Sequence, residues 1–224
     1  MPTPIIHHAV HNLQVAGIKL GGLPTLIRLI DCRDALIEDC TLYDPQGPAD
    51  PHGQCVQLIR STATIRRCRM VARTDRHGRF LSDAEDLLSV YGDEKGWMRG
   101  VKPVDEATGA LVLVEDCRFE GRGPSDSGTA VCQDGPFPPL LCMRQVVVRG
   151  ARVGFQHAGG AAILEDCDIR DCDEQTVATD GQWYAKDRRM AGAAVRPGTL
   201  LLRRLRTDRP VYKGKMPGRI VTRQ

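Results

Sequence analysis

One short phrase recurs along the chain, and this repeat constrains the fold more than any other feature. Residues 36–42 (LIEDCTL) return as 64–70 (TIRRCRM), 113–119 (LVEDCRF) and 163–169 (ILEDCDI), with a worn copy at 201–206 (LLRRLR). Each full copy has a largely apolar pair, two charged residues, a cysteine, a variable residue and an apolar residue. Because such a unit cannot bury its apolar side alone, the copies must stack on one another. The repeat therefore predicts a coil of short parallel strands.

The spacing of the copies predicts roughly seven turns. The cysteines of the four full copies are 28, 49 and 50 residues apart, and further strand signals fall between and before them. Two stretches interrupt the rhythm, a long charged insertion at 71–110 and loop segments at 121–139. Long insertions in repeat proteins are commonly functional. We expect residues 1–208 to form the coil with an N-terminal cap, and the basic residues 209–224 to form a C-terminal cap or a docking arm.

Nine cysteines are present, an odd number that cannot pair completely within the chain. Cys40, Cys68, Cys117 and Cys167 share one repeat position, so a coil stacks them about 4.8 Å apart. We interpret them as a structural column of small buried side chains. Cross-linking stays open as an alternative. No metal site is predicted, because the chain has no C-x-x-C pair.

Composition and charge argue against two classes of partner. The chain has 31 basic and 28 acidic residues, a balance that does not favour nucleic-acid binding. No apolar run is long enough for a membrane span. Residues 1–8 (MPTPIIHH) lack the basic and apolar regions of a signal peptide. We expect synthesis in the cytoplasm without a signal peptide, followed by incorporation into a virion or an extracellular assembly.

The repeat phrase, with cysteine where many relatives have asparagine, resembles the right-handed parallel β-helix of the pectate-lyase-like superfamily. Residues 83–91, 123–130 and 153–160 are similar in order to bacterial and phage β-helix proteins of poorly defined role. The resemblance implies an all-β, single-stranded right-handed parallel β-helix, a solenoid with long loop insertions. It does not transfer a catalytic role, since this scaffold hosts lyases, hydrolases, tailspikes and inert structural parts.

Five residues are candidates for catalysis if the chain is an enzyme. Asp83, Glu85 and Asp86 form an acidic cluster, and Arg76 and His77 lie nearby in sequence. In a strand Asp83 and Glu85 share one face while Asp86 points to the other. Carboxylates of this kind serve glycosidases or bind calcium, which lyases of the resembled superfamily use. The alternative is a solvated or salt-bridged loop. No cofactor is expected otherwise.

Two aromatic segments are candidates for binding. Trp97 and Arg99 lie in a glycine-flanked loop, and Trp183 and Tyr184 precede several basic residues. Such side chains stack on sugar rings or anchor protein contacts. The alternative is that they fold back over the coil. His157, after an expected strand, is interpreted as a hydrogen-bonded core or turn histidine.

The sequence favours a non-catalytic structural or binding module that decorates or joins a larger assembly. A phage virion or a surface appendage is the preferred setting, with other subunits as partners and polysaccharide as a further one. The alternative is a polysaccharide lyase or glycoside hydrolase acting on an acidic polysaccharide. Nucleic acid and membranes are not expected partners.

Overall fold

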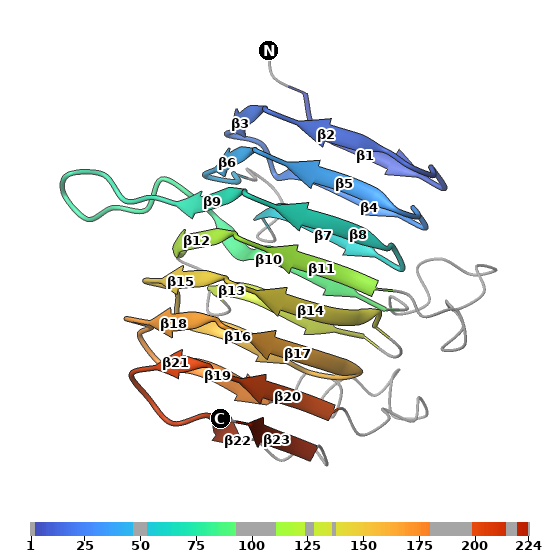
Figure 1. Cartoon of the computed structure of the whole chain (residues 1–224). Helices are drawn as coiled ribbons and strands as arrows, with labels where there is room; N and C mark the ends of the chain where they lie inside the picture. The colour runs from blue at the N-terminus through green and yellow to red at the C-terminus, as the bar shows by residue number, and fades with distance from the viewer. Residues whose placement is uncertain are drawn as a thin grey trace, which may run out of the picture.

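The computed structural model describes residues 3–46, 53–92, 111–123, 128–135, 138–179, 199–213 and 219–223. In these ranges the chain is all-β, without helix, and its strands form three sheets. Every ladder between strands of a sheet is parallel. Figure 1 shows the strands stacked along one axis, with the N-terminal strands at one end and the C-terminal strands at the other. The parallel β-class predicted from the repeat is confirmed.

The three sheets take successive strands in rotation. Sheet 1 contains β1 (Ile5–His8), β4 (Thr25–Ile30), β7 (Gly53–Ile59), β10 (Ala84–Tyr91), β13 (Thr129–Asp134), β16 (Val153–His157), β19 (Gln175–Thr179) and β22 (Tyr212–Lys213). Sheet 2 contains β2 (Gln14–Ala16), β5 (Ala35–Glu38), β8 (Ala63–Arg66), β11 (Leu111–Glu115), β14 (Leu140–Arg144), β17 (Ala161–Glu165), β20 (Thr199–Arg203) and β23 (Arg219–Arg223). Sheet 3 contains β3 (Lys19–Gly21), β6 (Thr41–Tyr43), β9 (Arg69–Ala72), β12 (Arg118–Gly121), β15 (Val147–Arg149), β18 (Asp168–Arg170) and β21 (Arg206–Thr207).

Each strand pairs with the strand three places before it, which is compatible with a parallel β-helix or solenoid. The basic stretch 209–224 takes part in this pattern. Its strand β22 pairs with β19, and its strand β23 pairs with β20, both in parallel. The stretch expected to cap or dock therefore contributes strands to two of the sheets.

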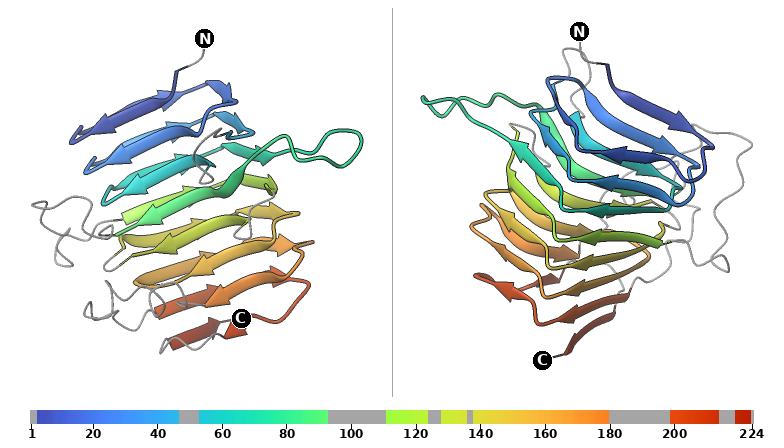
Figure 2. Two further views of the ribbon diagram at one scale, coloured as in Figure 1. Left: turned by 180° about the vertical axis from the view of Figure 1, so that it is seen from behind. Right: turned by 45° about the horizontal axis from the view of Figure 1, so that its top comes forward.

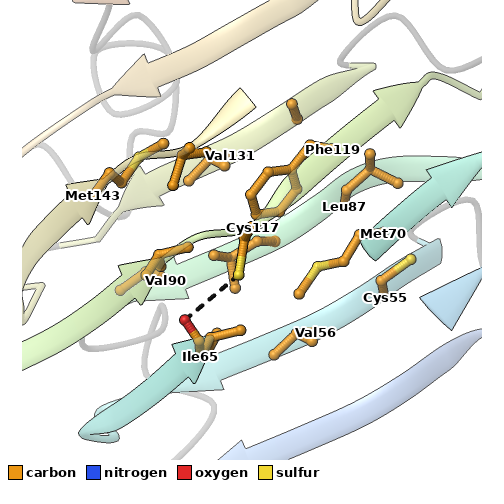
Figure 3. Packing of buried hydrophobic residues seen from close by; sticks show 14 of the residues in the cluster. Cys55, Val56, Ile65, Met70, Leu87, Val90, Cys117, Phe119, Val131 and Met143 are labelled. Carbon is orange, nitrogen blue, oxygen red and sulfur yellow. Dashed lines mark hydrogen bonds between the residues drawn. The ribbon is translucent and has the colours of Figure 1, made fainter. Parts of the chain in front are cut away.

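The core lies between the three sheets. Figure 3 shows Met70, Leu87 and Phe119 turned into this space together with the thiol of Cys117. In sheet 3 the buried residues stand in register along the stack, in the order Leu20, Leu42, Met70, Phe119, Val148 and Ile169. Burial of one large apolar side chain contributes about 1.5–3 kcal/mol, so this column is a main source of stability.

One residue in the left-handed conformation makes the turn from sheet 2 to sheet 3. In the repeated phrase this is the second charged residue, for example Asp39 with φ 55° and Arg67 with φ 51°. The residues with positive φ at this turn are, in chain order, Gly17, Asp39, Arg67, Asp116, Gln145, Asp166 and Arg204. A non-glycine residue in this conformation costs about 1–2 kcal/mol. The packing on both sides of the turn must therefore offset that cost.

Candidate functional site

The repeated cysteines follow these turns directly. Cys40, Cys68, Cys117 and Cys167 are buried, and all nine cysteines of the chain are free thiols. The Cys117 thiol lies 3.5 Å from the carbonyl oxygen of Ile65 in the neighbouring rung, as the dashed line in Figure 3 shows. Burial is the first cause that raises the pKa of Cys167 to about 11. A buried, protonated thiol is a poor nucleophile and metal ligand.

The charged residues beside the turns form a ladder of alternating sign. In register along sheet 2 stand Glu38, Arg66, Glu115, Arg144, Glu165 and Arg203. Arg204 forms ion pairs with Glu165 at 3.2 Å and with Asp166 at 2.6 Å. The arginines of the worn repeat are therefore matched by acids of the rung before, which does not favour a nucleic-acid patch.

The insertion after β9 begins with a hairpin that projects from the stack (Figures 1 and 2). Thr74 and Phe80 form an antiparallel bridge, and the Asp75 carboxylate closes the tip. This carboxylate accepts hydrogen bonds from the backbone N–H groups of His77 (2.8 Å) and Arg79 (2.9 Å). These contacts, together with the Arg79 side chain, lower the pKa of Asp75.

The base of the hairpin is fixed to Asp44 and Gln46, which follow β6 in the chain. Asp44 accepts hydrogen bonds from the backbone N–H of Arg73 at 2.8 Å and from its Nε at 2.7 Å. The amide of Gln46 donates to the carbonyl oxygen of Leu81 at 2.5 Å. Phe80 and Leu81 nevertheless remain 39% and 38% exposed. The hairpin is therefore held at its base while it presents apolar side chains.

Among the described residues, Arg76 and His77 form no hydrogen bond or ion pair with the acidic cluster of Asp83, Glu85 and Asp86. Both are exposed at the hairpin tip, where the Nε of Arg76 donates to the Nε2 of His77 at 3.0 Å. Asp83 and Glu85 are half-buried, whereas Asp86 is 3% exposed.

Asp86 sits in an enclosed polar setting at the start of β10. Its Oδ2 accepts hydrogen bonds from the Ser89 hydroxyl at 2.8 Å and the Tyr91 hydroxyl at 3.2 Å. In register, Asp86 stands opposite Gln54 of β7 and Thr129 of β13, and the register with β7 shifts between Ala84 and Asp86. The burial of Asp86 agrees with the alternation expected for a strand, whereas its two hydroxyl partners were not anticipated.

Burial raises the pKa of Asp86 to about 8, and the nearby Glu85 and Asp134 carboxylates act in the same direction. The Ser89 and Tyr91 hydroxyls oppose the shift. A carboxyl that stays protonated near neutrality has the chemistry of a general acid. Its burial, however, leaves little room for a substrate at that atom.

His157 is a second buried titratable group, and it points into the coil beside Phe155. The Gln133 amide donates to the carbonyl oxygens of Pro139 (2.9 Å) and Ala161 (3.0 Å). Its Oε1 therefore accepts from Nδ1 of His157 at 2.8 Å. Burial lowers the pKa of His157 to about 4, which keeps the ring neutral.

A basic hollow on the outer face of sheet 3 was not anticipated from the sequence. It has a volume of about 260 Å³ and is lined by Lys19, Thr41, Tyr43, Arg69, Val71 and Arg73. These residues come from β3, β6, β9 and the residue after β9, which are distant in sequence but adjacent in the sheet. An alignment of the residues that follow each left-handed turn would have placed these side chains at neighbouring positions of sheet 3.

Four predicted binding residues, Trp97, Arg99, Trp183 and Tyr184, lie outside the described residues. Within the described ranges no group of three or more histidine, cysteine or acidic side chains is arranged to hold a metal ion. The same ranges contain no helix that could cross a membrane. No protein-family model matches the chain, and no curated protein matches it significantly.

Proposed function

We propose that the chain is a single right-handed parallel β-helix of roughly seven turns, related to the β-helix proteins of the pectate-lyase-like superfamily. The rotation of strands through three sheets supports the winding, since β1 to β21 make up complete sets of three. The right hand follows from the general preference of parallel crossover connections, about 98% of which are right-handed.

Its role in this proposal is that of a non-catalytic structural and binding module in a larger assembly. A phage virion or a surface appendage is the proposed setting, reached after synthesis in the cytoplasm. The observation that carries the proposal is the projecting hairpin, which is braced at Asp44 and Asp75 and exposes Phe80 and Leu81. An ordered arm with exposed apolar side chains on a stiff stack suits docking on another protein.

Site-specific photo-crosslinking tests this role. A photoreactive phenylalanine analogue replaces Phe80 in one protein and exposed Gln14 of β2 in a matched control. In particles purified from the producing cells, position 80 is expected to crosslink to one defined subunit, and position 14 is not. Equal crosslinking from both positions, or a free monomer with no crosslink from position 80, contradicts the proposal.

A second candidate is a polysaccharide lyase or glycoside hydrolase, and the raised pKa of Asp86 is the observation that favours it. Bound calcium is proposed only for this enzymatic function, as a lyase would use it. The test incubates the protein with acidic polysaccharides, with and without Ca²⁺, and measures unsaturated product or new reducing ends. Cleavage that disappears in Asp86→Ala would put the enzyme first, whereas no cleavage leaves the binding module.

A further inference from the structure

The outer side of sheet 2 carries an apolar stripe. One outward position of successive strands, in register from β5 to β20, holds Leu36, Thr64, Leu113, Cys142, Ile163 and Leu201. The next residue of each strand points inward instead, as the buried Ile37 and Val114 do. Figure 1 shows these strands side by side along the stack. The stripe therefore lies on the outer side of the sheet, although all of its members except Thr64 are apolar.

Two exposed leucines widen the stripe at its middle. Leu111 of β11 and Leu140 of β14 stand in register at the start of their strands. They are 40% and 36% exposed. Single exposed apolar side chains are common on proteins, but a contiguous group of them marks an interaction site. Strands β11 and β14 are therefore the centre of a candidate interface.

The charge ladder of sheet 2 runs beside the stripe. Its members occupy the outward position two residues later in each strand, as Glu38 follows Leu36. Arg144 of the ladder forms an ion pair with Glu165 at 3.3 Å, yet its side chain remains 48% exposed. A guanidinium has five N–H donors, so Arg144 keeps donors for a carboxylate of another molecule.

The order of charges in the ladder is self-complementary. From β5 to β20 acid and base alternate, so the column begins with Glu38 and ends with Arg203. A two-fold axis that runs along the strands, between β11 and β14, reverses the order of the strands in a second copy. It sets Glu38 of one copy opposite Arg203 of the other, and Glu115 opposite Arg144. Every acid of this stretch then faces a base, a match that an alternating column makes only with an even number of charges.

We propose that sheet 2 forms the interface of a dimer, in which a second copy of this chain packs face to face with its stack reversed. The same axis sets Leu111 opposite Leu140 and Leu36 opposite Leu201, so apolar side chains meet beside the matched charges. With the stacks parallel instead, a two-fold axis would reverse the strands and carry the two ladders to opposite edges of the interface. The charge match therefore specifies the reversed arrangement. The inference does not rest on the proposed assembly role.

The size of the face suits a weak dimer. Sheet 2 has eight strands of up to five residues, which cover about 600 Å² per copy at about 4.8 Å per strand and about 3.3 Å per residue. The two copies together then bury about 1,200 Å², at the lower end of standard interfaces. We therefore expect a dissociation constant in the micromolar range.

Sedimentation velocity of the full chain over a range of concentrations tests the dimer. The wild type is expected to pass from monomer to dimer as the concentration rises. Glu115→Arg sets an arginine opposite Arg144 at two places in the interface, and Arg144→Glu sets a glutamate opposite Glu115. Because like charges then face each other, each variant is expected to dimerise about tenfold more weakly or worse.

An equimolar mixture of these two variants is the decisive sample. In the heterodimer the introduced arginine faces the introduced glutamate, and the native Glu115 and Arg144 face each other. The mixture is therefore expected to dimerise as the wild type does, a rescue that altered stability within either chain cannot produce. Lys19→Glu reverses an exposed charge on sheet 3 and is the control. It is expected to leave dimerisation unchanged.

Crosslinking tests the reversed arrangement even if a charge variant fails to fold. Leu36 and Leu201 lie five strand spacings apart in one chain, which is about 24 Å. A short bismaleimide cannot span this distance, whereas the dimer brings the two positions together. Leu36→Cys/Leu201→Cys is expected to give a covalent dimer, and each single substitution is not. The native thiols do not compete, because all nine are buried.

Several outcomes overturn the inference. A wild type that stays monomeric at every concentration removes the dimer. A mixture of the two charge variants that stays monomeric, while the wild type dimerises, places the contact on another face. Crosslinking of Leu36→Cys alone, or none in the double variant, contradicts the reversed stack. Gln14 lies at the end of the stripe, so a photo-crosslink from it joins two copies of the chain, and its mass separates it from a crosslink at Phe80 to another subunit.

Discussion

Glu38 of β5 and Arg66 of β8 lie directly opposite each other in sheet 2 and form an ion pair of 2.8 Å. Arg66 in turn stands opposite Glu115 of β11, so each charge of the ladder has an opposite charge above or below it. These contacts lower the pKa of Glu38, chiefly through the hydrogen bond from Arg66. Opposite charges across paired strands stabilise a register, and like charges in the same place oppose it. The ladder therefore helps to specify which rung follows which.

Reversing one charge of the ladder is expected to destabilise the stack more than neutralising it. Glu38→Arg places a third arginine beside Arg66 and Arg67, whereas Glu38→Gln only removes the attraction. The expected order of thermal midpoints is wild type, then Glu38→Gln, then Glu38→Arg. High salt should bring the three closer together, because it screens exposed charges. A Glu38→Arg protein as stable as the wild type would show that the ladder contributes nothing.

Acid is expected to weaken the fold through His157. Its pKa is lowered to about 4 in the folded protein, while an unfolded histidine titrates near about 6.5. Its contribution to stability is therefore complete above the unfolded value and is lost as the pH falls from there through about 4. The loss is on the order of 3 kcal/mol at most.

Urea unfolding between neutral and mildly acidic pH measures this effect. His157→Gln should flatten the acid dependence, and His77→Gln at the exposed hairpin tip should leave it unchanged. If the slope persists in His157→Gln, another group is responsible for it.

Rising pH is expected to weaken the fold through Asp86 between about pH 4 and about pH 8. Its pKa is raised to about 8 in the folded protein, whereas an unfolded aspartate titrates near about 3.9. The folded state thus favours the protonated carboxyl. This contribution is complete below the unfolded pKa, is lost as the pH rises from there to about 8, and does not change above that value. Asp86→Asn cannot ionise, so its stability relative to the wild type should rise between about pH 4 and about pH 8 and then level off.

Urea midpoints at about pH 5 and at about pH 8 check this prediction. The exposed Asp39→Asn serves as control, since the pKa of Asp39 is lowered by its hydrogen bond from Arg67. Its stability difference from the wild type should be the same at both pH values. An Asp86→Asn protein that shows no relative gain at the higher of these two pH values would place the titration elsewhere.

The local pattern was sufficient to predict the parallel strands and their turns. In each phrase the apolar positions, the turn and the buried cysteine lie within seven residues, so the repeat carries them. The strands of 209–224 were not anticipated, because β22 has two residues and depends on pairing with β19. The burial of Asp86 between half-buried neighbours agrees with strand alternation, but alternation does not say that the hydroxyls of Ser89 and Tyr91 donate hydrogen bonds to this carboxyl.

The hollow at Tyr43 could not be predicted from local sequence for a different reason. Lys19, Tyr43 and Arg69 come from separate rungs, and only the stacking of β3, β6 and β9 brings them together. The catalytic candidates were grouped by proximity in sequence instead. Proximity along the chain places Arg76 and His77 next to the acidic cluster, yet the hairpin carries them to an exposed tip.

The turn residue Gln145 offers a test of the left-handed conformation that recurs at the turn from sheet 2 to sheet 3. Its φ is +53° and its side chain is exposed, while the equivalent residues Asp39, Arg67 and Arg204 form ion pairs. Asparagine tolerates this conformation better than glutamine, whereas a β-branched residue is strained in it. Gln145→Asn is therefore expected to stabilise the protein by a few tenths of a kcal/mol. Gln145→Ile is expected to destabilise it by about 1 kcal/mol or more.

Exposed Thr199, at the start of β20, provides the matched control because its backbone is extended. There the order should reverse, with Thr199→Ile more stable than Thr199→Asn, since strands favour β-branched residues. Urea unfolding of the four variants measures both orders. If isoleucine equals or exceeds asparagine at position 145, the backbone of that turn is not left-handed in solution. The strands on either side of Gln145 would then be joined by a different turn from the one in the structure.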